Sequence, residues 1–380
     1  MTSRDRLLTV LKGEIPDCVP AAPDTSNMIP AKMTGLPFWD VYLFNKIPIW
    51  SAYINCAKYF DFDSLMDGYI DVRFDDLGEI DRDWKEYIVF RDDYQIVTRM
   101  MRKRHTHEEW GRTVNAYYID NPPTHNLPLN RFGLPEIPSH YECVEKENEP
   151  LEGAALLKEA KAQMGNQGLV GVSCGRSSLI GNDEEVYDYY DNPQKYEDMR
   201  DRLIDRFTAR FHKLMSLPAD SRPDFICTGC SGSLIFQTPH MFETLALPIV
   251  KHVTALCKQH GIPSHIHSCG PEAKLIEYCY KHTDLTVVDP LEIPPMGDCN
   301  LKELKKLYGD KLVLKGNLHT TDVMLRGTTE DVIKASKQAI DDGAAGGRFI
   351  LSTGDQCGRD TPHENLFALI ETARTYGKYR

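Results

Sequence analysis

The sequence of 380 residues lacks the segments that would direct a chain to a membrane or to nucleic acid. No apolar run approaches the roughly 18 residues that a membrane-spanning helix needs. The N-terminal stretch Met1-Thr2-Ser3-Arg4-Asp5-Arg6 lacks the apolar core of a signal peptide. The chain has no long block of Lys and Arg, and its formal net charge is −12. We therefore expect a cytoplasmic protein that binds neither membrane nor nucleic acid.

The sequence also lacks the cysteine spacing of a disulfide framework. Its 11 cysteines are scattered, which favours a reducing compartment. Cys227 and Cys230 have the spacing of a redox pair, but they lie where an apolar run passes into a glycine-containing loop. We interpret Cys230 as a residue that lines a pocket. The phosphate-binding pattern Gly-x-Gly-x-x-Gly does not follow the first predicted strand, which argues against an open, doubly wound sheet.

Apolar runs alternate with helix-like stretches from residue 152 onward. Strands are predicted at 19–23, 168–172, 224–227, 265–269, 285–288, 312–314 and 349–351. This alternation implies parallel strands with right-handed crossovers, and with one early unit that the pattern does not place, their number approaches eight. We predict an α/β fold, a single (β/α)8 TIM barrel over residues 1–380 with an N-terminal helical segment. A hairpin and a loop region form an insertion at about 90–150, and the aromatic residues between 33 and 60 are interpreted as core.

A His-x-Cys pair ends the apolar stretch from Ile262 to Gly270. Side chains at i and i+2 of a strand share a face, so His267 and Cys269 point the same way. An imidazole and a thiolate in this arrangement form half of a zinc site. Cys357 follows another apolar run in a loop flanked by glycines. Two strand ends would then offer thiolates to one pocket, and the predicted zinc ligands are His267, Cys269 and Cys357.

Two more polar residues follow predicted strands and are candidates for the lining of the same pocket. Asn27 lies in the polar stretch after the first strand, and His319 lies shortly after the strand at 312–314. In a barrel of parallel strands these positions surround the mouth.

Several motifs together resemble those of the uroporphyrinogen decarboxylase superfamily. They are Arg4-Asp5-Arg6-Leu7-Leu8, Gly13-Glu14-Ile15-Pro16-Asp17-Cys18-Val19-Pro20, Lys315-Gly316-Asn317-Leu318 and Asp360-Thr361-Pro362-His363-Glu364-Asn365-Leu366. The resemblance covers nearly the whole chain. It implies a barrel of eight strands and helices with the pocket at the carboxyl ends of the strands.

The resemblance leaves two branches of the superfamily to compare. The arginine-rich substrate motif of the decarboxylases is replaced here by the stretch at 24–29, which has no arginine. The other branch consists of zinc methyltransferases that exchange methyl groups with a corrinoid protein. Its hallmark, His-x-Cys and a later Cys, is matched by His267 and Cys269. In its thiol-specific members the later cysteine stands where this chain has Asp355, and Cys357 falls two residues further on.

The third ligand and the catalytic acid follow from this comparison. We predict Cys357 as the third zinc ligand and keep Asp355 as the alternative. Glu292 ends another strand and is either a fourth, exchangeable ligand or a carboxylate that forms hydrogen bonds in the pocket. Asp355 or Glu292 could protonate or position a departing oxygen, so both are predicted to be catalytic.

The function predicted from these residues is zinc-dependent methyl transfer. The methyl group would pass from a small methylated substrate, first of all a methoxylated aromatic, to the Co(I) corrinoid (cobalamin) of a partner protein. The chain has no Asp-x-His-x-x-Gly signature of a cobalt-ligating histidine, so the corrinoid is expected on a separate protein. Transfer from a methylcobamide to a thiol is the alternative, and decarboxylation is a further one. The sequence is compatible with a homo-oligomer.

Overall fold

The computed structural model describes residues 1–229 and 231–379. Contacts between residues group the chain into two compact units. The first comprises Met1–Thr25, Ala57–Val72 and Ala154–Arg380, and the second comprises Ser26–Cys56 and Arg73–Gly153. The predicted insertion at about 90–150 falls entirely within the second unit.

The first unit contains a seven-stranded sheet in which every neighbouring pair of strands is parallel. In spatial order its strands are β1 (Ser64–Met66), β7 (Gly168–Ser173), β8 (Phe225–Thr228), β9 (Ser264–His267), β10 (Val287–Asp289), β11 (Val313–Leu318) and β12 (Phe349–Thr353). The six strands predicted after residue 152 are confirmed. The early unit that the pattern did not place is β1, which has only three residues.

The predicted strand at 19–23 is present as a single bridge. Ala21 forms an isolated parallel bridge with Leu351 of β12. The Ala21 carbonyl also accepts a hydrogen bond of 2.7 Å from the backbone N–H of Asp63, which directly precedes β1. This segment therefore contacts both ends of the seven-stranded sheet. The predicted eight-stranded barrel is confirmed in part, as a curled parallel sheet of seven strands joined by a bridge.

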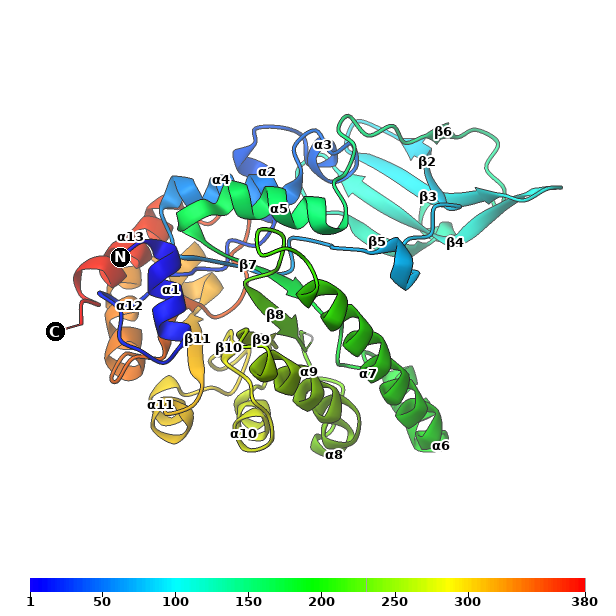
Figure 1. Ribbon diagram of the computed structural model, residues 1–380. Helices are drawn as coiled ribbons and strands as arrows, with labels where there is room; N and C mark the ends of the chain where they lie inside the picture. Colours follow the sequence, from blue (N-terminus) through cyan, green and yellow to red (C-terminus); the bar gives the residue numbers. More distant parts are fainter. Residues whose placement is uncertain (230, 380) are drawn as a thin grey trace. The chain divides into compact units, whose positions relative to one another are not determined.

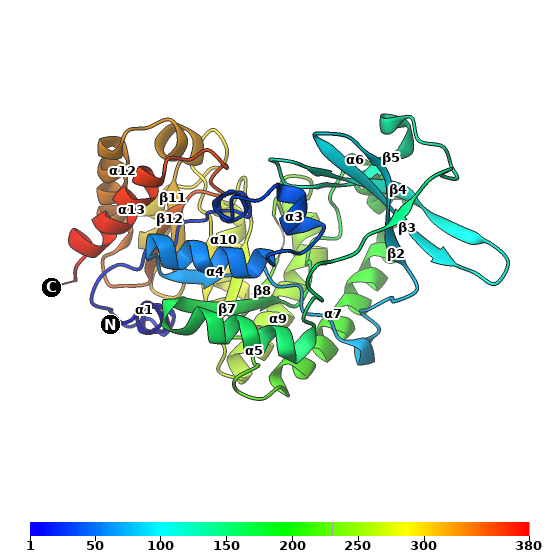
Figure 2. The ribbon, with the colours of Figure 1, turned by 90° about the horizontal axis from the view of Figure 1, so that it is seen from above.

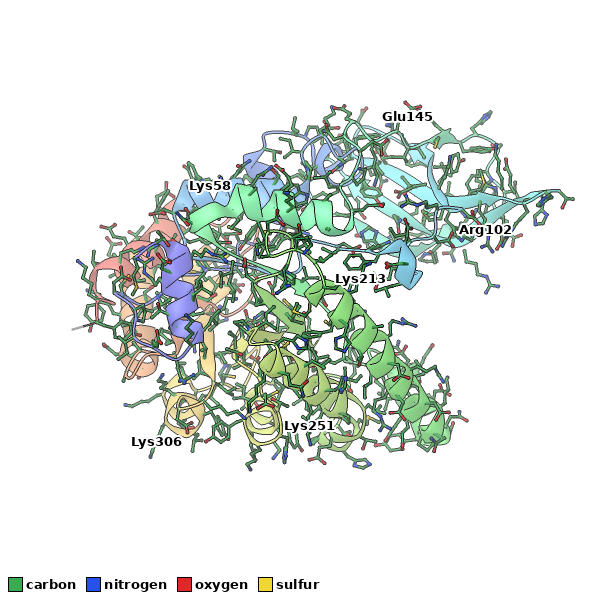
Figure 3. The ribbon with its side chains drawn as sticks, viewed as in Figure 1. Lys58, Arg102, Glu145, Lys213, Lys251 and Lys306 are labelled. Carbon is green, nitrogen blue, oxygen red and sulfur yellow. The ribbon has the colours of Figure 1, made fainter. Side chains whose placement is uncertain are left out.

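Helices of the first unit alternate with these strands. They are α1 (Ser3–Leu11), α5 (Gly153–Met164), α6 (Asp183–Asp191), α7 (Pro193–Met215), α8 (Pro239–Met241), α9 (Leu247–Gln259), α10 (Ala273–His282), α11 (Leu301–Tyr308), α12 (Thr329–Gly343) and α13 (His363–Thr375), with short 3₁₀ or π segments η3 (Gly165–Gln167), η4 (Phe242–Ala246) and η5 (Thr320–Leu325). Figures 1 and 2 show α12 and α13 packed side by side. Exposed lysines such as Lys251 of α9 and Lys306 of α11 lie on outer helix faces (Figure 3). No helix in the described part of the chain is long and apolar enough to cross a membrane.

Side chains inside the sheet form an apolar layer and then a polar one. The apolar layer is closed by α1, and its members are Leu7, Val10, Leu11, Ala22, Leu65, Leu169, Phe225, Val287, Val313 and Ile350. Residues two positions further along a strand point to the same side. The next layer therefore contains the polar residues Asp67, Cys227, Asp289 and Lys315. The fold places these polar groups above a sealed apolar base, at the carboxyl ends of the strands.

The second unit is built on a five-stranded antiparallel sheet in the order β5-β4-β3-β2-β6. Its elements are α2 (Met28–Met33), α3 (Phe38–Tyr42), η1 (Asp75–Leu77), β2 (Lys85–Arg91), β3 (Gln95–Lys103), β4 (Glu108–Tyr118), β5 (Thr124–Pro128), η2 (Leu129–Phe132) and β6 (Glu142–Cys143), and α4 (Ile49–Phe60) runs from this unit into the first. The predicted hairpin is the β3–β4 pair. Trp39 and Tyr42 pack against buried Leu43 and Ile96, so these two aromatic residues belong to the core, as predicted.

Candidate metal centre

Three polar side chains from three strand ends meet in the first unit. They are Cys269, just after β9, Glu292, just after β10, and Asp355, just after β12. The Cys269 sulfur and one oxygen of each carboxylate lie within 4.8 Å of one another. The Nε2 atom of His267 lies 3.7 Å from Asp355 Oδ1. We call these four residues the outer cluster. It brings together four of the residues singled out from the sequence.

The ring of His267 is oriented by Asp289, a buried carboxylate at the end of β10. His267 Nδ1 lies 3.2 Å from Asp289 Oδ1, and Asp289 is only 2% exposed. The other Asp289 oxygen is paired with the ammonium group of Lys315. A histidine that ligates a metal commonly donates its other N–H to a carboxylate in this way. Nδ1 is therefore engaged, and Nε2 is the nitrogen that faces the outer cluster.

The electrostatic environment of His267 favours positive charge. Burial alone would lower the pKa of this imidazole, but the charge of Asp289 and its hydrogen bond raise it well above the ordinary value. A site that stabilises an imidazolium also attracts a metal cation to the same place.

Glu292 is held by the backbone next to Cys269. The Gly270 N–H donates a hydrogen bond to Glu292 Oε2, and the glutamate is 7% exposed. Burial, together with the charge of Asp355, raises the pKa of Glu292, although the Gly270 hydrogen bond opposes the shift. Glu292 therefore lies with the possible ligands and also forms a hydrogen bond, and its role stays a prediction.

Asp355 has an unusual backbone conformation. Its φ is 141°, a value that residues with a side chain rarely adopt. Leu291, which directly precedes Glu292, also has a positive φ, of 62°. Such residues cost free energy and cluster at functional sites. The loops that present both carboxylates therefore contain strained backbone conformations.

Cys357, the predicted third ligand, has a different environment. Its side chain is fully buried, and its backbone N–H donates to the carbonyl of Asp24 at 2.8 Å. Burial raises the pKa of the thiol to about 12, although hydrogen bonds with Thr353 and Thr361 oppose this. Among the described residues, the group that meets Cys269 and Glu292 within 4.8 Å is Asp355, the alternative.

The three predicted pocket residues have separate locations. His319 Nδ1 accepts hydrogen bonds from the backbone N–H groups of Thr321 and Asp322, so this ring caps η5. His319 also lines a cavity of about 440 Å³ beside β11 and α12. Asn27 belongs to the second unit, where its carbonyl accepts from the Tyr42 hydroxyl at 2.9 Å. Cys230 lies outside the described residues.

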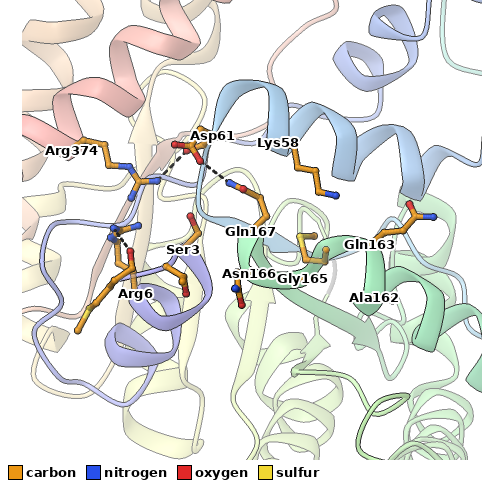
Figure 4. Close-up of a pocket in the computed structure, with 13 residues that line it drawn as sticks. Ser3, Arg6, Lys58, Asp61, Ala162, Gln163, Gly165, Asn166, Gln167 and Arg374 are labelled. Atoms are coloured by element: carbon orange, nitrogen blue, oxygen red, sulfur yellow. Dashed lines mark hydrogen bonds between the residues drawn. The ribbon is translucent and has the colours of Figure 1, made fainter.

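A larger cavity lies at the opposite ends of the strands. It has a volume of about 720 Å³ and is lined by residues of α1, α5 and the C-terminal part of α4 (Figure 4). Its arginines are engaged: Arg6 pairs with Asp17 and Asp63, and Arg374 donates to the Asp61 carbonyl. This cavity contains none of the predicted site residues.

Residues that the sequence analysis did not assign to the site complete the polar layer. They are Asp67, Cys227, His265, Asp289 and Lys315. His265 lies two residues before His267, so the alternation that paired His267 with Cys269 also places His265 on that face. The positions of Asp67 and Asp289 depend on strand register.

Comparison with known proteins decides the family. Residues 187–376, half of the chain, match uroporphyrinogen decarboxylase (URO-D). The chain belongs to the uroporphyrinogen decarboxylase family. The predicted resemblance is confirmed, and relatives of this family member are methyltransferases, as the branch predicted from His267 and Cys269 would require.

Two of these relatives are methylcobamide:CoM methyltransferases MtbA. The protein from Methanosarcina mazei is 27% identical over 137 residues, which is 36% of this chain and 37% of the relative. That from Methanosarcina acetivorans is 27% identical over 135 residues, with the same coverage. The match thus spans little more than a third of each curated relative. A solved methyltransferase from Methanosarcina mazei aligns with 99% of this URO-D family chain at a TM-score of 0.60 and 14% identity, which shows a shared fold.

Proposed function

We propose that this chain is a zinc-dependent methyltransferase that moves a methyl group from a small methylated substrate to a corrinoid. The observation that carries the proposal is the outer cluster, where a thiol, an imidazole nitrogen and two carboxylates converge at the carboxyl ends of β9, β10 and β12. Sulfur, nitrogen and oxygen donors in a group of four suit zinc. We assign His267, Cys269 and Asp355 as ligands, with Glu292 beside them.

The residues of the chain have separate tasks in this mechanism. Zinc, when bound, supplies a Lewis acid for the heteroatom that carries the methyl group. Asp289 fixes the ring of His267 so that Nε2 faces the cluster. Glu292, which accepts a hydrogen bond from the Gly270 N–H, would give a proton to the departing atom. The apolar layer closes the polar layer from below, so the corrinoid would approach from the carboxyl ends of the strands.

The nature of the donor follows from the proton that Glu292 can supply. An alkoxide, phenolate or amine leaves poorly unless it is protonated or bound to a metal, so a proton donor suits a methyl ether or amine. A methoxylated aromatic is our first choice. The second candidate is transfer from a methylcobamide to a thiol, and the similarity to methylcobamide:CoM methyltransferases supports it. A carboxylate where the thiol enzymes have a cysteine favours the first.

The test is turnover with reduced cobalamin. The purified protein is incubated with cob(I)alamin and a panel of methoxyarenes, methylamines, methanol and thiols, and the change from Co(I) to methyl-Co(III) is followed by absorbance. Cys269→Ala should remove one equivalent of zinc and the activity, while circular dichroism stays unchanged. Cys143→Ala, at an exposed cysteine of the second unit, is the matched control and should keep both. Full activity of the metal-stripped protein would end this assignment.

The corrinoid is proposed to arrive on a partner protein, and the loop at 353–359 would contribute to the docking surface. Arg359 in this loop is 26% exposed at its side chain and is paired with Asp360. Charges at the rim of an interface mainly affect the rate of encounter. Arg359→Ala should therefore slow transfer to a protein-bound corrinoid more than transfer to free cobalamin. Stoichiometric cobalamin that co-purifies tightly with this chain alone would contradict a separate carrier.

A further inference from the structure

A second group of possible ligands lies below the outer cluster in the polar layer. Asp67 directly follows β1, Cys227 lies in β8 and His265 lies in β9. One ligand atom of each lies within 4.8 Å of the others. Cys227 and His265 are register partners in adjacent strands, which places them side by side. We call these three residues the inner cluster.

The Nδ1 atom of His265 is the unusual atom of this group. The residue is only 1% exposed, and its Nδ1 has no hydrogen-bond partner among the described residues. Asp67 Oδ2 lies 2.9 Å from it, close enough for an ion pair but outside the direction in which an N–H would point. A buried polar atom is rarely left in this state without a reason.

Two ligands of the same ion have this relation. Each ligand atom directs its lone pair at the metal. Two ligand atoms of one ion therefore lie close together without pointing at each other as a donor and an acceptor would. Nitrogen and oxygen bound to one tetrahedral zinc are about 3.3 Å apart, and sulfur and oxygen about 3.5 Å, from the usual bond lengths. The corresponding distances here are 2.9 Å for His265 Nδ1 to Asp67 Oδ2 and 3.9 Å for Cys227 Sγ to Asp67 Oδ2.

The other nitrogen of His265 has the support that a ligating histidine needs. Nε2 lies 2.9 Å from Asp289 Oδ1, the same oxygen that contacts His267 Nδ1. Asp289 is paired with Lys315, so its charge is already balanced. A divalent cation with the carboxylate of Asp67, the thiolate of Cys227 and a neutral His265 would give a second balanced group.

We propose that Asp67, Cys227 and His265 bind a second divalent metal ion of the zinc type, distinct from the ion of the outer cluster. The combination of sulfur, nitrogen and one oxygen suits Zn²⁺ or Co²⁺ and does not suit Mg²⁺ or Ca²⁺. Asp67 lies outside residues 187–376, whereas Cys227 and His265 lie inside them. Because the three ligands come from β1, β8 and β9, the ion would tie these strands together. It would lie between the apolar layer and the outer cluster, so its role is structural.

The experiment uses the full chain, stripped of metal and titrated with Co²⁺, with metal content checked by mass spectrometry. The native chain should bind two equivalents, each with a thiolate-to-cobalt absorption band. Cys227→Ser and Cys269→Ser should each bind one, and the double variant none. Cys143→Ser is the control and should bind two. His265→Asn, of similar size, should also lose one equivalent, which guards against misfolding of one variant alone.

A stability measurement gives an independent readout. In Cys269→Ser, removal of the remaining ion by a chelator should lower the melting temperature, and the double variant should show no such change. The inference is overturned if Cys269→Ser binds no metal, or if Cys227→Ser and His265→Asn bind as much as the native chain. A single equivalent that survives Cys269→Ser and is lost in Cys227→Ser supports the inner cluster and rejects the zinc ligands of the proposed function. The two ideas can therefore fail separately.

Discussion

Substitution of Asp355 by glycine should make the metal-free protein more stable and the metal site weaker. The residue has a φ of 141°, which glycine adopts freely and other residues do not. Its carboxylate is also the proposed zinc ligand. One substitution therefore removes a strained backbone and a functional group together, and the two effects have opposite consequences for the protein.

The magnitude follows from the backbone. A residue in such a sparsely populated region destabilises the folded chain by on the order of 1–3 kcal/mol, which glycine would relieve. The greater freedom of glycine in the unfolded chain opposes this gain by about 0.4–1 kcal/mol. The net gain is about 0.5–2 kcal/mol. The entropy of unfolding is about 2.1 cal/mol/K per residue. For 380 residues, the gain in free energy divided by this entropy corresponds to a rise of roughly 1–3 °C in melting temperature.

Asp355→Asn is the matched control, because it removes the same charge near His267 without relieving the backbone. The melting temperatures of both variants are measured by calorimetry in excess chelator, so that bound metal does not contribute. Zinc affinity is measured separately by competition with an indicator, and both variants should lose more than the roughly 10–100-fold typical of a change next to a ligand. Equal melting temperatures would show that the backbone at this position stores no strain. Native zinc affinity in both variants would remove Asp355 from the ligand set.

Three further results are expected. Asp289→Asn should weaken zinc binding at the outer cluster by about 10–100-fold, measured by chelator competition, since it disturbs the partner of a ligating ring; unchanged affinity would assign Asp289 a purely structural role. Burial alone would raise the pKa of Asp224, but hydrogen bonds from Arg4 and the backbone, with nearby positive charges, lower it. Its stabilisation is therefore present above the unfolded value of about 3.9 and is lost as the pH falls through the lower folded value. Asp224→Asn should melt earlier than the native chain at pH 7, and the difference in melting temperature should shrink as the pH is lowered below the unfolded value; parallel curves would refute this. Gly168→Ala should destabilise the β1–β7 pair by about 1–3 kcal/mol in denaturant unfolding, because its Cβ would lie 2.0 Å from the Ser64 carbonyl oxygen; a neutral result would contradict that packing.

The strands of the first unit could be predicted because most of them are apolar runs separated by amphipathic helices. The pairing of His267 with Cys269 followed from the two-residue period of a strand. The same period also places His265 on the face of His267 and Cys269. β1 could not be found in this way, since three residues next to an aspartate have no periodic signal.

The conformations of the loops in the site could not be predicted from the sequence pattern. Whether Asp355 or Cys357 turns toward Cys269 depends on a backbone angle that residues of this type seldom adopt, so no propensity indicates it. The role of Asp289 depends on the register that places it opposite His267 in the neighbouring strand. Sequence analysis singled out the strand ends that carry Cys269, Glu292 and Asp355, and the folded chain brings these three side chains together.

The bridge between Ala21 and Leu351 has a consequence for biosynthesis. The Ser352 hydroxyl also donates to the Ala22 carbonyl, a contact between residues 330 positions apart. At translation rates of about 5–20 residues per second, roughly 15–65 s pass between the synthesis of these two partners. During that interval the segment around Ala21 lacks its pairing partner in β12. Asp355 is made later still, so the metal site proposed at the outer cluster is complete only after both of these partners have been synthesised.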